Sequence, residues 1–137
     1  MGDRAVIHFV DEGREEVSPA TYLHWGGHEV EELLRECFEL MKSRGPDVGY
    51  TAARFIGICH ARDPKSNMSL GTWNAPSLRK IRQRDGDRWS YGTGDAGVFL
   101  VHLSSAGWSI EMFGGYGFDS GGRYRDSVRR VDWRWQA

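Results

Sequence analysis

Two imidazoles, a phenol and an indole fall within seven residues of this 137-residue chain, at Tyr22, His24, Trp25 and His28. A Gly26-Gly27 pair interrupts them. Histidine can transfer protons or hold a metal, aromatic rings can pack against a partner, and glycine lets the backbone approach a ligand closely. We therefore take the four aromatic and imidazole side chains as candidate binding residues.

His24 and His28 are four residues apart, which is the spacing of histidine ligands on helical zinc sites. The two glycines between them disfavour a continuous helix, and the chain has no H-E-x-x-H or C-x-x-C motif. We expect neither a metal nor another cofactor. His24 and Trp25 should be partly buried and hydrogen-bonded, while His28 should cap the start of a helix.

The segment Gly92–Gly97 matches G-x-G-x-x-G, the phosphate-binding fingerprint of dinucleotide sites. That site needs a strand before the glycines and a helix after them, whereas here a charged segment precedes and a strand pattern follows. We interpret it as a turn in which Asp95 accepts hydrogen bonds from local backbone amides.

Arginines gather in a second candidate segment, at Arg79, Arg82, Arg84 and Arg88, and Trp89 follows them. Guanidinium groups beside stacking rings suit single-stranded nucleic acid or a nucleotide. The formal net charge of −1 lacks the basic excess of a general nucleic-acid binder, so we expect at most a local contact to a nucleotide or an anionic partner.

A third candidate surface is acidic. Glu29, Glu32, Glu36 and Glu39 follow 3-4-3 spacing, which places them in one stripe of a helix. Such a stripe is either a solvated face or a docking surface for a basic partner, and the second reading makes Glu32, Glu36 and Glu39 candidate binding residues.

The elements that must position these residues follow from hydrophobic periodicity. Ala5 to Val10 and Glu16 to His24 read as a hairpin, with Pro19 at an edge or a bulge. His28 to Ser43 reads as a helix with an apolar face at Val30, Leu33, Leu34, Cys37, Leu40 and Met41. A second helix, capped by Asp47, should bury Val48, Ala52, Phe55, Ile56 and Cys59.

The rest of the chain is more irregular. Residues 60–92 read as a long arginine-rich loop that holds only a short strand between Met68 and Trp73. Gly97–Leu103 and Trp108–Phe113 then form a hairpin, a Gly-rich segment covers 114–122, and the alternation of Val131, Trp133 and Trp135 with charged residues predicts a last strand.

Strands before and after a helical pair predict one α+β domain over residues 1–137, an antiparallel sheet with two helices packed on one face. Its single core should contain the apolar residues Trp108, Ile110, Met112, Leu33, Leu34, Cys37, Phe55 and Cys59. No secretory leader is expected at the start, and no apolar run reaches the roughly 20 residues that span a bilayer. We therefore expect a cytosolic protein with reduced cysteines and no membrane contact.

Four short motifs occur together in a characteristic order. They are Tyr22 to His28, the A-A-R-F of Ala52–Phe55, the S-L-G of Ser69–Gly71 and the G-D-A-G-V of Gly94–Val98. In these motifs the chain resembles a group of small uncharacterised proteins encoded by phages, plasmids and integrative elements. It departs from that group around residues 79–88 and after Gly114.

The resemblance implies a non-enzymatic binding protein that inhibits host defence, similar to anti-CRISPR proteins, either by occluding a host protein or by sequestering a nucleotide. It implies no established chemistry. The alternatives are a small hydrolase or transferase that uses His24, His28 or Asp95 as acid or base, and an accessory protein with a purely structural role.

Overall fold

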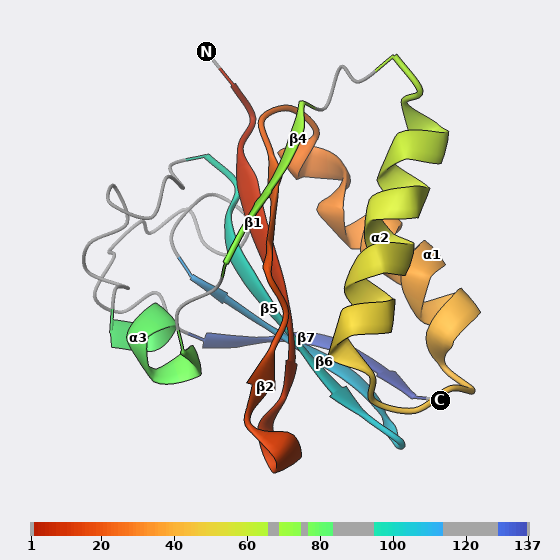
Figure 1. Ribbon diagram of the computed structural model, residues 1–137, viewed down its shortest axis with the longest axis vertical. Coiled ribbons are helices and arrows are strands. Elements are labelled where there is room, and N and C mark those ends of the chain that lie inside the picture. The colour runs from red at the N-terminus through yellow and green to blue at the C-terminus, as the bar shows by residue number, and fades with distance from the viewer. Residues whose placement is uncertain (1, 66–68, 75–76, 84–94, 114–128, 137) are drawn as a thin grey trace.

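The computed structural model of the chain describes residues 2–65, 69–74, 77–83, 95–113 and 129–136 (Figure 1). Its sheet has seven strands in the order β4-β3-β1-β5-β6-β7, with β2 paired to β1. The strands are β1 (Ala5–Asp11), β2 (Glu16–Val17), β3 (Ala20–Leu23), β4 (Leu70–Trp73), β5 (Gly97–Ser104), β6 (Gly107–Phe113) and β7 (Arg129–Gln136). The helices are α1 (Val30–Met41), α2 (Val48–Arg62) and α3 (Leu78–Gln83), with short 3-10 turns η1 (Glu12–Arg14) and η2 (Gly27–Glu29).

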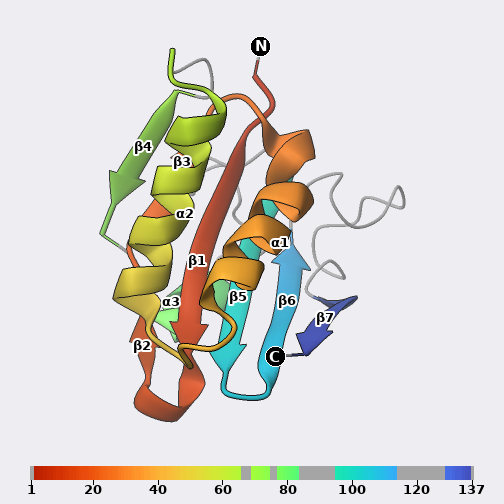
Figure 2. The same ribbon diagram turned by 90° about the vertical axis from the view of Figure 1, so that its right-hand side faces the viewer.

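The predicted α+β class is confirmed, and Figure 2 shows α1 and α2 side by side over one face of the sheet. The sheet is not wholly antiparallel, because β1 and β5 pair in parallel, from Ala5 opposite Gly97 to Val10 opposite His102. The chain between them contains both long helices and is long enough to carry the chain back to the same end of the sheet before β5 begins.

The main core lies between the sheet and the pair α1 and α2. It contains every residue that the sequence assigned to the core, from Leu33, Leu34 and Cys37 to Trp108, Ile110 and Met112. Phe9 in β1 lies at its centre, with ring centroids 5.7 Å from Phe55 and 5.9 Å from Trp108. Cys37 and Cys59 are free thiols, and burial raises the pKa of each to about 12.

The buried face of α1 differs from the predicted one at its two margins. Leu40, expected on the apolar face of the helix, is 56% exposed, whereas Phe38 is 4% exposed and packs against Trp108 and Trp135. In α2 the predicted cap is confirmed, since the Asp47 side chain accepts a hydrogen bond from the Tyr50 amide. The buried face of α2 includes Thr51 and Ile58, and Ile56 is only half-buried.

The predicted second extended segment is divided at Ser18-Pro19 into β2 and β3, which both pair with β1. The pairing of β3 with β1 is shifted by one residue relative to the pairing of β2 with β1, as expected of a bulge at Pro19. Ser18 fills the gap, because its hydroxyl accepts from the Phe9 amide and its own amide donates to the Phe9 carbonyl.

The predicted loop at residues 60–92 is more ordered than expected within the described residues. The predicted short strand is confirmed as β4, which pairs with β3. The order beyond the prediction is the continuation of α2 to Arg62 and the short helix α3 at residues 78–83. Leu78 and Ile81 pack α3 onto the sheet face opposite α1 and α2, against a smaller apolar cluster. Two apolar residues among charges were too weak a pattern to predict it. The Gly-rich segment 114–122 lies outside the described residues, and no helix among the described ones is long and apolar enough to cross a membrane.

The α3 side of the sheet also holds a fully buried histidine, His8, which shares this face with Val6 and Val10 of the smaller cluster. Its Nδ1 donates to the Ser18 carbonyl oxygen at 3.2 Å, and burial lowers the pKa of the ring from 6.5 to about 4. The folded protein therefore keeps His8 neutral at a pH where the unfolded chain binds a proton.

Acid should destabilise the protein through His8. The pKa of His8 is 6.5 in the unfolded chain and about 4 in the folded protein. The neutral ring therefore contributes its full stability above pH 6.5, and this contribution is lost as the pH falls toward 4. From pH 7 to pH 5 we expect this residue alone to remove about 2 kcal/mol of unfolding free energy. Urea unfolding at both values should show that the His8→Gln variant loses less stability than the natural chain over this interval. Equal losses would contradict the neutral, buried imidazole.

Candidate binding surface

Four aromatic side chains, Trp25, His24, Tyr22 and Trp73, lie in consecutive ring contact at one edge of the sheet, and we call them the aromatic row. The His24 ring lies 5.2 Å from Trp25 and 6.1 Å from Tyr22, and Tyr22 lies 5.5 Å from Trp73, measured between centroids. Trp25 is 45% exposed and Trp73 36% exposed, while the two rings between them are half-buried. Large aromatic surface is thus presented to solvent in a fixed arrangement.

Strand pairing builds the row. In β3 Leu23 points into the main core, so its neighbour Tyr22 points to the α3 side and packs against the smaller apolar cluster. β4 runs antiparallel to β3 with Trp73 opposite Ala20, which places Trp73 diagonally next to Tyr22.

Hydrogen bonding fixes the centre of the row. The Tyr22 hydroxyl and His24 Nδ1 are 2.8 Å apart. Burial raises the pKa of Tyr22, Arg4 opposes this rise and Asp95 adds to it. The phenol therefore keeps its proton and can donate it in the bond to His24.

An ion pair lies beside the row. The Asp95 carboxylate accepts from both the backbone amide and Nε of Arg4, at 2.9 and 2.8 Å. The hydrogen bond to Arg4 holds the pKa of Asp95 below its usual range and raises the pKa of Arg4. The prediction that Asp95 bonds local backbone amides was wrong, since its partner is 91 residues away and joins β1 to the start of β5.

The backbone turns sharply after Trp25, where Gly26 has φ 94°. Gly27 lies so close to the residues that precede β1 and β5 that a Cβ there would be 2.8 Å from the Asp3 carbonyl oxygen. Both features agree with the predicted special backbone at the glycine pair. His28 does not cap α1 as predicted. The Asp3 carboxylate instead accepts from the amide and from Nδ1 of His28, whose side chain is 70% exposed and whose pKa this bond raises.

Replacing Gly26 by alanine should lower the free energy of unfolding by about 1–2 kcal/mol, because a side chain disfavours this left-handed conformation. Gly57→Ala is the matched control, since Gly57 lies in α2 with nothing within 4 Å of the added Cβ. It should stabilise the protein by about 0.5–1 kcal/mol. Urea unfolding that gave both variants the same sign would contradict the strained turn.

Part of the predicted arginine-rich segment lies on the side of the sheet that carries Tyr22 of the aromatic row. Arg79 is exposed on α3, the helix that packs against the cluster containing Tyr22. The backbone of Arg82 belongs to α3, but its side chain, together with Arg84, Arg88 and Trp89, lies outside the described residues.

The acidic stripe runs from Glu29 in η2 along α1, on the side of the sheet opposite α3. Arg62 at the end of α2 contacts three of its carboxylates, at 3.7 Å from Glu29, 3.2 Å from Glu32 and 2.9 Å from Glu36. Glu39 pairs with Lys42 at 2.8 Å. Basic groups of the chain itself therefore face the stripe, and Arg62 links α2 to it.

The structure thus brings Tyr22, His24 and Trp25 together, and it adds Trp73 and the Arg4–Asp95 pair, which sequence reasoning missed. Strand order alone brings Trp73 beside Tyr22, so no local pattern could have identified it. Among the residues that the structure describes, no group of three or more His, Cys, Asp or Glu is arranged to hold a metal ion.

Comparison with protein-family models, with curated proteins and with solved structures gave no match to this chain. Functional inference therefore starts from the geometry of its own residues.

Proposed function

We propose that this is a non-enzymatic binding protein that holds a protein partner on the aromatic row. The observation that carries the proposal is the exposure of Trp25 and Trp73 in a continuous chain of ring contacts. Tryptophan, tyrosine and arginine are enriched among the residues that contribute most to protein–protein affinity. Rings that already pack on one another lose little conformational entropy when a partner covers them.

The positions of the ionisable groups favour binding over catalysis. His24 bonds Tyr22, His28 bonds Asp3, and Asp95 bonds Arg4. Each of the three candidate acid–base residues thus has a separate partner. A lowered pKa also makes Asp95 a weak base near neutral pH.

The resemblance to proteins of phages and other mobile elements supports a narrower proposal. The partner is a component of a host defence system, which the protein inhibits by occlusion in the host cytosol. The two buried free thiols suit such a reducing compartment. Arg79, on the same side of the sheet as Tyr22, would add attraction to an acidic partner.

Capture from host lysate tests this function when three forms of the protein are compared. The natural chain and the Leu40→Ala variant should retain one host protein in a stoichiometric amount, because Leu40 is exposed on α1, away from the row. The Trp25→Ala/Trp73→Ala variant, folded by circular dichroism, should not retain it. Equal retention by all three forms, or turnover of a host substrate that His24→Ala abolishes, would contradict the proposal.

A further inference from the structure

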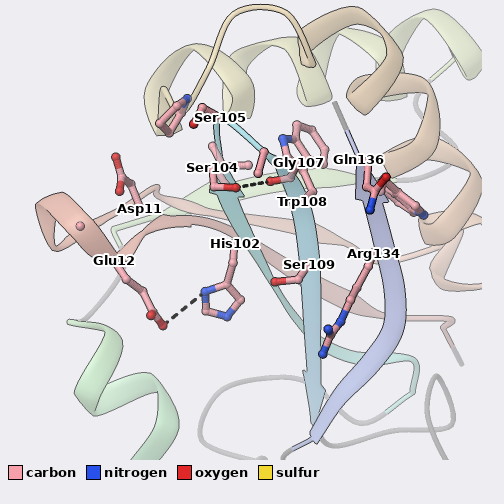
Figure 3. A pocket seen from close by; sticks show the side chains of 15 residues that line it. Asp11, Glu12, His102, Ser104, Ser105, Gly107, Trp108, Ser109, Arg134 and Gln136 are labelled. Atoms are coloured by element: carbon pink, nitrogen blue, oxygen red, sulfur yellow. Dashed lines mark hydrogen bonds and ion pairs between the residues drawn. The ribbon is translucent and has the colours of Figure 1, made fainter.

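A second site lies at the other end of β1, away from the aromatic row. An open groove of about 690 Å³ is formed there by the end of β1, the turn between β5 and β6, and the end of β7 (Figure 3). One side of the groove is lined by Asp11 and Glu12, and the other by Ser109, Arg134 and Gln136. His102 lies between the two sides.

Strand register sets three polar side chains of this groove in one line. His102 of β5 is opposite Ser109 of β6, and Ser109 is opposite Arg134 of β7. Directly opposite residues on neighbouring strands have Cβ atoms about 4.5–5.5 Å apart and point to the same face. Figure 3 shows the imidazole, the hydroxyl and the guanidinium on adjacent strands.

The imidazole is held in a fixed orientation. Its Nε2 lies 2.8 Å from the buried Glu111 carboxylate, and its Nδ1 lies 3.3 Å from Glu12, which is about half exposed at the rim of the groove. The buried carboxylate orients the ring, as second-shell carboxylates do for functional histidines. The ring is thus a fixed wall of the groove, next to Ser109 and Glu12.

Two donors beside this ring, Arg134 and Ser109, are uncommitted. Within the described part of the chain, Arg134 has no carboxylate at ion-pair distance and the Ser109 hydroxyl has no hydrogen-bond partner. A bulge in the β6–β7 pairing follows directly after Ser109. Bulges are frequent where a strand re-aims a side chain at a functional site.

Gly107 holds β7 in place at this end. It pairs with Gln136 and has φ 142°, and a Cβ on it would collide with the Trp135 carbonyl oxygen. The close approach of the turn to β7 fixes the backbone that carries Arg134.

We propose that this groove binds a phosphomonoester that also carries hydroxyl groups, such as a sugar phosphate or a nucleoside monophosphate. Arg134 and Ser109 donate to the phosphate, the guanidinium through the two-pronged geometry that matches phosphate oxygens. Asp11 and Glu12 on the opposite side repel a bare anion and accept hydrogen bonds from sugar hydroxyls. The carboxylates therefore select for a phosphate attached to a polyol.

Calorimetric titration with four probes tests the site: inorganic phosphate, ribose, ribose 5-phosphate and adenosine monophosphate. The two phosphomonoesters should bind, inorganic phosphate should bind more weakly, and ribose should not bind. A difference between the two esters distinguishes a sugar phosphate from a nucleotide as the preferred ligand.

Variants assign the contacts. Arg134→Gln should weaken ester binding by about tenfold or more, the usual effect of losing a charge-assisted hydrogen bond. Arg79→Gln on α3 should leave it unchanged. Glu12→Gln should strengthen the binding of inorganic phosphate, because it removes a competing carboxylate. Circular dichroism and the melting temperature establish that each variant is folded.

Three results would overturn the phosphate site: no binding of either ester at millimolar concentration, equal affinity of folded Arg134→Gln and the natural chain, or equal loss in Arg79→Gln. The outcome is independent of the partner site, since the Trp25→Ala/Trp73→Ala variant should bind the esters with unchanged affinity.

Discussion

The Phe9→Ala variant should lose about 3–5 kcal/mol of unfolding free energy, the usual cost of truncating a buried phenylalanine. Phe9 has no solvent exposure and meets Phe55 of α2 and Trp108 of β6 edge to face. Its removal leaves a cavity where the sheet, its hairpin and the second helix converge, and these elements cannot collapse into it without moving one another.

Urea unfolding followed by tryptophan fluorescence measures this loss. Leu40→Ala is the control, because a leucine that is 56% exposed leaves no cavity and should change stability by about 0.5 kcal/mol or less. A loss below about 1 kcal/mol in Phe9→Ala, or an equal loss in both variants, would contradict the packing of α2 on β1.

Periodicity predicted most of the main core because each long element has one apolar face. It could not decide the margins of α1. Phe38 and Leu40 lie on opposite edges of the same apolar stripe, at similar angles from its centre. The sheet extends under the Phe38 side, where Trp108 and Trp135 cover the ring, and this tertiary asymmetry leaves Leu40 exposed.

Local sequence patterns could not predict the relative direction of the strands either. β1 and β5 read as ordinary strands, but whether they pair in parallel depends on the path of the chain through α1, α2 and β4. The same long-range pairing produces the Arg4–Asp95 ion pair, so the sequence suggested a local role for Asp95 that the fold does not support.

In the candidate sites, too, the sequence identified residues that are neighbours along the chain and missed those that strand pairing brings together. Tyr22, His24 and Trp25 are near in sequence, so composition identified them directly. Trp73 joins them only through β3–β4 pairing, and His102, Ser109 and Arg134 meet only through the register of three strands. Serine and histidine on separate strands carry no local signal.

Truncating both exposed rings of the aromatic row should have the largest effect on function. Trp25→Ala/Trp73→Ala should weaken partner binding by about 2 kcal/mol or more, which is about 30-fold. Both residues are substantially exposed, so the fold should survive their truncation. Most of the loss should appear as faster dissociation, because the row contributes packing and no net charge.

Isothermal titration calorimetry of the purified host partner tests the central claim most directly. Three forms are compared: the natural chain, Trp25→Ala/Trp73→Ala, and the Glu32→Gln/Glu36→Gln/Glu39→Gln variant, which removes the negative charge of the stripe. We expect the tryptophan variant to bind about 30-fold more weakly or worse and the glutamine variant to bind within a few-fold of the natural chain. The reverse order, with full affinity in the tryptophan variant and loss in the glutamine variant, would contradict the aromatic row and move the interface to α1.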